Sequence, residues 1–267
     1  FASDWKSYRE RQLVKHKNLV FIFSDQQRYD TMACYGNDWI KTPNINSLSE
    51  ESMIMERAYV GQPVCTPARG TITTGLHPHN AGPTVNVIPL PSDQKTIAEY
   101  LPSEYKTAWF GKWHLGEEEL RDHGFDYHYF RLGGGGSYNN APFVRNGIKE
   151  HSEGYVTDII TDGAIEFIQT QVEADEPFYA SIHYTAPHSP WYGHPQDIVD
   201  SYQDCPFESC PQEAPHPWMA GSPTEFKGGK QMLQGYFAAV TAMDANVGRI
   251  VALLDDLGIR EETLIAF

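Results

Sequence analysis

Short apolar runs rich in β-branched and aromatic residues alternate along this chain with longer segments of helical periodicity. The apolar runs lie at residues 18–24, 53–59, 106–110, 178–184 and 263–267. Helical patterns lie between them, at residues 42–51, after Pro67, and at 96–101, 155–172 and 231–257. Such alternation is typical of an α/β fold in which helices flank a mostly parallel central sheet.

The segment 231–257 has the clearest helical pattern. Phe237, Val247 and Leu254 recur at helical spacing, and Gly258 supplies a stop signal just beyond them. This stripe predicts a core helix. The chain has no run of 18 or more purely apolar residues, so we expect no membrane-spanning segment.

The charge balance limits the classes of partner. Lys and Arg number 20 against 35 Asp and Glu, which gives a formal net charge of −15 over 267 residues. Nucleic-acid binding depends on phosphate contacts from basic residues, so this balance argues against it. An anionic substrate would have to be attracted locally, in a pocket, because the overall field repels it.

Cysteine usage leaves the compartment open. Cys205 and Cys210 flank a four-residue loop and either pair or remain free, whereas Cys34 is expected to be a small packing residue. A disulfide would indicate an oxidising compartment. The sequence begins at Phe1 without a leader pattern, which is compatible with a leader that has been removed. The location stays open, with a periplasmic or secreted one slightly favoured over a cytoplasmic one.

Residues 65–69 combine a cysteine, a helix-starting proline and an arginine. Proline is tolerated in the first helical turn, so Cys65 is predicted at or just before a helix N-terminus, where unpaired amides favour an anion. Arg69 adds a permanent cation one turn later. The alternative is a buried structural cysteine beside a surface arginine.

Further polar residues follow the predicted strands. Asp25 and Gln26 follow the first strand, Lys112 and His114 follow the third, and His188 lies beyond the fourth. Because ligands of open α/β sheets bind at the carboxyl ends of strands, we expect these residues to meet at one rim.

Other segments near this rim carry weaker signals. The run of four glycines at 133–136 is too featureless to indicate phosphate binding, and residues 185–229 are expected to form an irregular insertion that shapes substrate access. Four further histidines receive no role: His77, His79, His183 and His194.

The Cys-x-Pro-x-Arg core and the Gly-Lys-Trp-His sequence at 111–114 resemble the two signatures of the sulfatases, a branch of the alkaline-phosphatase superfamily. The run ending in Asp25 and the Pro-His-x-Pro pattern around His188 resemble two further family loops. The resemblance implies an alkaline-phosphatase-like three-layer sandwich. It also implies a sulfuric ester hydrolase in which a formylglycine-generating enzyme converts Cys65 to formylglycine during maturation.

The resemblance assigns roles to individual residues. A divalent cation, calcium with magnesium or manganese as alternatives, would be bound by Asp25, Gln26 and residue 65. Arg69 would hold the formylglycine and Lys112 a sulfate oxygen. His114 would orient the hydrated aldehyde or take its proton, and His188 would act on the leaving group. The substrate would be a sulfated sugar, an aryl ester or a small alcohol ester.

One feature of the candidate metal loop departs from the family pattern. Many sulfatases have two aspartates where this chain has Asp25 and Gln26, which keeps open a phosphonate or phosphate ester hydrolase with the same site. A non-catalytic binding relative is a second alternative. Residues 1–267 are expected to be the N-terminal catalytic domain, with the family's last metal loop and smaller C-terminal domain lying beyond Phe267. The exact substrate, the metal and the oligomeric state stay open.

Overall fold

The computed structural model describes residues 17–116, 120–210 and 229–267. A seven-stranded mixed sheet runs through its centre in the order β5-β4-β3-β2-β6-β1-β7. Its strands are β1 (Asn18–Phe23), β2 (Lys106–Lys112), β3 (Tyr127–Arg131), β4 (Pro142–Arg145), β5 (Ile148–His151), β6 (Phe178–His183) and β7 (Thr263–Ala266). The strands β1, β2, β3, β6 and β7 are parallel, whereas β4 and β5 join one edge as an antiparallel pair.

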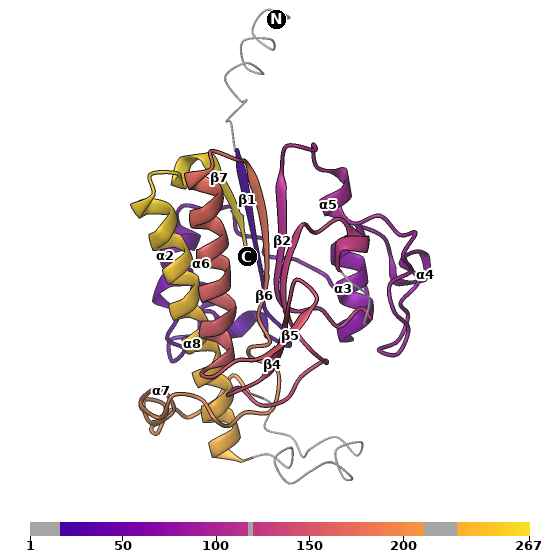
Figure 1. Ribbon diagram of the computed structural model, residues 1–267. Coiled ribbons are helices and arrows are strands. Elements are labelled where there is room, and N and C mark those ends of the chain that lie inside the picture. The colour runs from indigo at the N-terminus through magenta and orange to yellow at the C-terminus, as the bar shows by residue number, and fades with distance from the viewer. Residues whose placement is uncertain (1–16, 117–119, 211–228) are drawn as a thin grey trace, which may run out of the picture.

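Helices cover both faces of the sheet (Figure 1). One layer consists of α2 (Pro43–Glu50), α6 (Val156–Glu173) and α8 (Lys230–Asp256). The other contains α3 (Cys65–Thr74), α4 (Pro78–Ala81) and α5 (Ile97–Tyr100). A short helix, α7 (Gln196–Asp200), lies in the loop that follows β6, and single 3₁₀ turns lie at Tyr29–Thr31, Ala33–Tyr35, Leu120–His123 and Arg260–Glu262. This is the predicted three-layer α/β sandwich.

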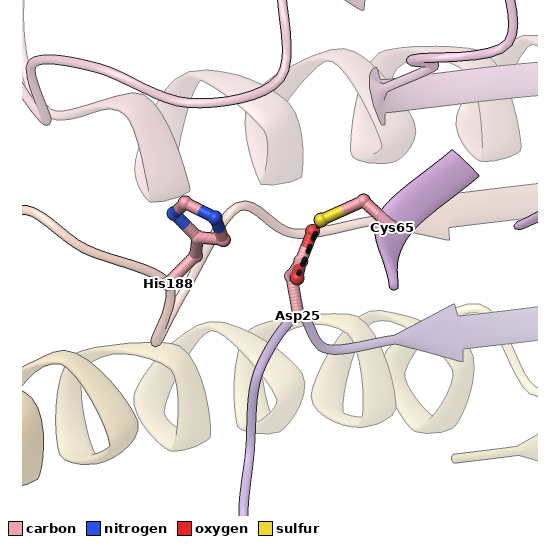
Figure 2. A group of neighbouring side chains, drawn as sticks. All are labelled: Asp25, Cys65 and His188. Carbon is pink, nitrogen blue, oxygen red and sulfur yellow. Dashed lines mark hydrogen bonds between the residues drawn. The ribbon is translucent and has the colours of Figure 1, made fainter. Parts of the chain in front are cut away.

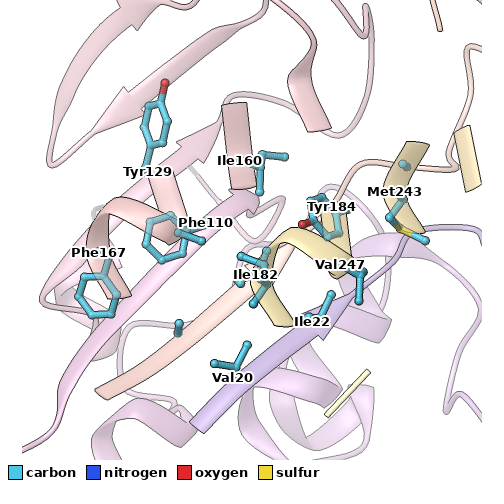
Figure 3. Packing of buried hydrophobic residues seen from close by; sticks show 14 of the residues in the cluster. Val20, Ile22, Phe110, Tyr129, Ile160, Phe167, Ile182, Tyr184, Met243 and Val247 are labelled. Carbon is cyan, nitrogen blue, oxygen red and sulfur yellow. The ribbon is translucent and has the colours of Figure 1, made fainter. Parts of the chain in front are cut away.

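The two faces of each central strand feed two separate cores, because side chains alternate along a strand. On β1, Val20 and Ile22 enter the core beneath α6 and α8, whereas Phe21 packs against the opposite cluster. Figure 3 shows the first core, in which Phe110, Ile182 and Val247 meet between sheet and helices. The second is aromatic, built around Trp109, Trp113 and Phe125.

The helix α8 confirms the predicted core stripe. Val247, Ile250 and Leu254 are fully buried against the sheet. By length and composition α8 is apolar enough to cross a membrane, but 61% of its most apolar window is buried within the protein. A helix that covers a hydrophobic sheet meets the same criteria.

The prediction for residues 53–59 is wrong. The segment is irregular and exposed, and no strand of the described residues pairs with it. An apolar β-pattern is local, whereas a strand also needs a neighbouring strand. Strands β3, β4 and β5 were not predicted, because they are short and carry polar residues. Cys205 and Cys210 are both buried, and neither forms a disulfide bond among the described residues. Of the predicted insertion 185–229, residues 211–228 lie outside the described residues.

Candidate active site

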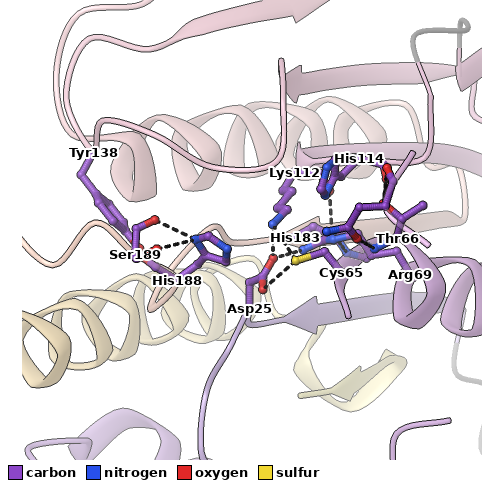
Figure 4. Close-up of polar contacts among 11 residues, drawn as sticks. Asp25, Cys65, Thr66, Arg69, Lys112, His114, Tyr138, His183, His188 and Ser189 are labelled. Carbon is purple, nitrogen blue, oxygen red and sulfur yellow. Dashed lines mark hydrogen bonds and ion pairs between the residues drawn. The ribbon is translucent and has the colours of Figure 1, made fainter. Parts of the chain in front are cut away.

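The candidate site lies at the carboxyl ends of three adjacent central strands, β2, β6 and β1. Asp25 comes two residues after β1, Lys112 is the last residue of β2, and His188 lies in the loop after β6. The backbone N–H of Asp25 donates to the carbonyl of Ala186 at 3.0 Å, which ties the β1 and β6 loops together. The rim predicted from the sequence therefore exists, and Figure 4 shows four of its residues there: Asp25, Lys112, His114 and His188.

Cys65 is the first residue of α3, so its side chain lies beside unpaired helical amides. The next residue fixes its position: the Thr66 hydroxyl donates to the carbonyl of His114 at 2.9 Å, and the Thr66 N–H donates to Asn86 Oδ1 at 3.0 Å. These contacts attach the start of α3 to the loop after β2. Two segments almost 50 residues apart in the sequence thus form one wall.

Three buried charges form what we call the Asp25 network: Asp25, Arg69 and Lys112. Arg69 Nη2 donates to Asp25 Oδ2 at 2.9 Å, and Lys112 Nζ lies 2.5 Å from the same oxygen. Burial opposes ionisation of Asp25, but the charges of Arg69 and Lys112 outweigh it and lower the pKa of the carboxyl. Burial also lowers the pKa of Lys112, with a further contribution from the Arg69 charge.

The Cys65 thiol lies next to this network. Lys112 Nζ is 3.4 Å from the Cys65 sulfur, and Asp25 Oδ1 is 3.8 Å from it. A hydrogen bond from His114 is the largest contribution that lowers the thiol pKa, and it outweighs burial and the Asp25 charge. A half-buried cysteine with a lowered pKa at a helix N-terminus matches the setting of reactive cysteines.

His188 completes a cluster that could hold a metal ion. One ligand atom from each of Asp25, Cys65 and His188 lies within 4.8 Å of the others (Figure 2). The ring Nδ1 of His188 lies 2.7 Å from the carbonyl of Ser189, so Nδ1 carries the hydrogen and Nε2 keeps its lone pair. Burial lowers the pKa of His188 and the Lys112 charge adds to this, which favours the neutral, ligating form.

Gln26 is exposed and adopts a left-handed backbone with φ of 62°. Its backbone carbonyl accepts a hydrogen bond from the Tyr236 hydroxyl at 3.1 Å, which fixes the backbone of this loop. That contact leaves the amide side chain uncommitted. Its predicted place among the metal ligands stays a prediction.

His183, the last residue of β6, belongs to the site although no role was predicted for it from the sequence. Its Nδ1 lies 3.3 Å from Arg69 Nη1, and its Nε2 lies 2.7 Å from the Ser181 hydroxyl. Its ring stacks on Trp109 with centroids 3.6 Å apart. Burial and the Arg69 charge hold the His183 pKa well below its usual value, so the ring is neutral and accepts from Arg69. Its position at the end of a buried strand was the only signal in the sequence.

Comparisons with known proteins agree on one family. The sequence profile of the sulfatases matches residues 17–267. The ulvan-active sulfatase of Formosa agariphila is 31% identical over 98% of this chain and 52% of that protein. The N-acetylglucosamine-6-O-sulfatase of Bacteroides thetaiotaomicron is 27% identical over 97% of this chain and 58% of that protein.

Solved structures show the same fold. The crystal structure of Ps i-CgsB superimposes with a TM-score of 0.79 and 26% identity, over 93% of this chain and 57% of that one. A phosphonate monoester hydrolase of Agrobacterium radiobacter, at 19% identity and a TM-score of 0.65 over 93% of this chain and 61% of that one, shares the fold alone. The chain spans about half the length of the curated relatives it matches.

Proposed function

The chain belongs to the sulfatase family, and on that premise we propose that the protein hydrolyses the sulfate ester of a sulfated sugar, an aryl ester or a small alcohol. Because this chain matches only about half of each relative's length, the activity of the whole protein is part of the proposal. Sulfated sugars are favoured, since the names of the two relatives refer to ulvan and N-acetylglucosamine.

The observation that carries the proposal is the position of Cys65 at the start of α3, beside two buried cations. Lys112 Nζ lies 3.4 Å from the Cys65 sulfur, and the Arg69 guanidinium lies one helical turn away on the same helix. An ester attacked by residue 65 would place its non-bridging oxygens next to these charges. Fixed cations that meet charge developing in the transition state are an effective means of catalysis.

Residue 65 fits a modification that supplies the nucleophile. Formylglycine, made from the Cys65 thiol by a formylglycine-generating enzyme, supplies a hydrated aldehyde with one hydroxyl to attack sulfur and a second to release sulfate. Arg69 orients residue 65 through the Asp25 network, and His114 accepts or returns a proton at residue 65.

His188 is proposed to act on the leaving alcohol. Its neutral ring presents an Nε2 lone pair, so it must first take up a proton before it can protonate that oxygen. The negative charge of a bound sulfate would favour this protonation. His188 therefore serves either as a metal ligand or, once protonated, as the general acid.

A divalent cation fits the donor set of the site. With a thiol at residue 65, the cluster of Asp25, Cys65 and His188 offers mixed sulfur, nitrogen and oxygen donors. With formylglycine, residue 65 and Asp25 offer hard oxygen ligands, joined by the predicted Gln26, which suits calcium, magnesium or manganese. Such an ion would neutralise charge on the sulfate oxygens. Calcium takes about six to eight oxygen ligands, so others must come from water, substrate or further residues.

The test is to produce the protein with a formylglycine-generating enzyme and analyse the peptide that contains residue 65 by mass spectrometry. We expect loss of the thiol and gain of an aldehyde or its hydrate, together with release of sulfate from aryl and sugar sulfates. Cys65→Ala should lower kcat by roughly a millionfold, the scale seen when a nucleophile is removed. The half-buried Cys34, replaced by Ala, is the matched control.

Three results would contradict the proposal. They are an unmodified Cys65 in active protein, full activity in the Cys65→Ala variant, and faster turnover of an aryl phosphodiester than of an aryl sulfate. The last would assign the protein to the phosphonate or phosphate ester hydrolases instead. A protein that binds sulfated sugars without hydrolysing any of them would be the non-catalytic relative.

A further inference from the structure

Arg131 is a buried cation beside the site that the proposed reaction does not use. It is the last residue of β3, in register with Lys112 on the neighbouring β2, and only 4% of it is exposed. Neither Nε nor Nη1 has a hydrogen-bond partner among the described residues. Burial lowers the Arg131 pKa, and the opposing contribution comes from the hydroxyl of Tyr138. A buried guanidinium without a counter-ion is strongly unfavourable unless an anion joins it.

The glycine run, residues 133–136, links Arg131 to the two site histidines. A β-carbon on Gly134 would lie 2.4 Å from the His114 ring, and one on Gly135 would lie 3.1 Å from the His188 ring. A β-carbon on Gly136 would lie 2.8 Å from Arg131 Nη2. Three successive residues span at most about 10 Å, so both imidazoles and the guanidinium border the same short piece of backbone.

A second arginine, on the strand that pairs with β3, provides a contrast. Arg145 on β4 is partly exposed and lies 3.2 Å from Glu166 and 3.5 Å from Glu150. The two carboxylates and the face of the Tyr129 ring stabilise the positive charge of Arg145. Arg145 thus has its counter-ions within the protein, whereas Arg131 Nε and Nη1 are buried without a hydrogen-bond partner among the described residues.

We propose that Arg131 binds a second anionic group of the substrate, a carboxylate or a further sulfate on the sugar, while the reacting sulfate lies at residue 65. This inference rests on the proposed function and narrows its substrate class to sugars with at least two acidic groups. The planar guanidinium suits either group, because it donates two parallel hydrogen bonds to an oxyanion. The last three glycines of the run serve the same subsite, since a β-carbon on Gly134, Gly135 or Gly136 would crowd a histidine or Arg131.

The experiment compares three sugars that share one scissile ester: a hexosamine 6-sulfate, the corresponding 2-N,6-O-disulfate, and the 6-sulfate linked to a uronic acid. We expect wild-type protein to prefer at least one of the two sugars with a second acid. Arg131→Gln should lower this preference, the ratio of the kcat/KM values, by about tenfold or more, the scale of hydrogen bonds to a charged group. Arg131→Lys should give an intermediate fall, and Arg145→Gln should keep the wild-type ratio.

A binding arm separates this inference from the proposed function. In the Cys65→Ala background, calorimetry should show the same loss of preference for the doubly acidic sugars on adding Arg131→Gln, whether or not hydrolysis occurs. Loss with the disulfate alone would identify a sulfate subsite, and loss with the uronic acid alone a carboxylate subsite. A preference that Arg131→Gln leaves unchanged, or an equal loss for all three sugars, would overturn the proposal.

Discussion

The Asp25 network and the glycine run with Arg131 both lie at the carboxyl ends of the parallel strands. Each region contains a buried arginine, but the two arginines differ in the partners that the protein supplies. Arg69 is fully buried, and its two Nη groups contact the Asp25 carboxylate, the Lys112 carbonyl and the His183 ring. Only its Nε lacks a hydrogen-bond partner among the described residues. Arg131 is nearly as buried, and two of its nitrogens have none among the described residues. The protein supplies a carboxylate counter-ion for Arg69 and, among the described residues, none for Arg131.

We relate this difference to two roles: Arg69 and Lys112 serve catalysis, and Arg131 serves substrate recognition. Groups that stabilise a transition state work best when they are held in place before substrate arrives, as Arg69 and Lys112 are. A group that selects the substrate must instead keep hydrogen-bonding capacity for it, at a cost in stability of the free protein. We therefore expect changes in the Asp25 network to affect turnover of every substrate, and changes at Arg131 to affect the choice among them.

Removal of Lys112 from the Asp25 network should cause the largest loss of activity. Lys112→Ala deletes a buried cation 3.4 Å from residue 65, and kcat should fall by roughly a hundredfold or more, as when one preorganised donor is lost. Steady-state kinetics on an aryl sulfate measures the effect. Lys106→Ala, at the half-exposed start of the same strand and 3.5 Å from Glu176, is the control and should keep wild-type kcat. An unchanged kcat/KM in a folded Lys112→Ala protein would show that the role is misassigned.

Acid should lower the free energy of unfolding through His194, which lies in the loop after β6. This buried histidine lies 2.9 Å from the Tyr155 hydroxyl and against the Tyr138 ring, and burial lowers its pKa to about 4. Between pH 6.5 and about 4 the unfolded chain takes up a proton that the folded one does not, so stability is lost as pH falls through that window. The contribution is on the order of 3 kcal/mol.

Urea unfolding at neutral pH and near pH 4.5 measures this loss. His194→Gln should be less acid-sensitive than the wild type, because it cannot take up the proton. His151→Gln, on the exposed edge strand β5, should retain the wild-type pH dependence. If His194→Gln lost as much stability in acid as the wild type, the neutral buried state would be ruled out.

The smallest effect should come from His183, which positions Arg69 without reaching residue 65. His183→Leu removes the acceptor of Arg69 Nη1 and should lower kcat about tenfold with little change in KM, the scale for supporting residues of a site. His183→Gln restores an acceptor oxygen and should recover part of the loss. Equal kinetics for Leu and Gln at this position would mean that His183 acts only through packing on Trp109.

Local sequence patterns predicted much of the site because they report on local chemistry. The Cys-x-Pro-x-Arg spacing depends only on helix geometry, and the structure accordingly places Cys65 as the first residue of α3. The polar residues after buried strands were expected at one rim because parallel strands end on the same side of a sheet, and the structure brings Asp25, Lys112 and His188 together there. Gln26 is the exception, with its side chain exposed.

What the sequence by itself determined was the α/β alternation, the core stripe of α8 and the segments that carry the chemistry. What only the tertiary structure decided was which strands lie next to each other and which side chains become hydrogen-bond partners. Residues 53–59 have a strand pattern but no neighbouring strand among the described residues, and His183 and Arg131 have ordinary sequence surroundings but opposite environments. Burial and hydrogen-bond partners depend on residues that are distant along the chain, so no local pattern contains them. The contrast between Arg69, which has a carboxylate counter-ion, and Arg131, which has none among the described residues, therefore became visible only in the folded protein.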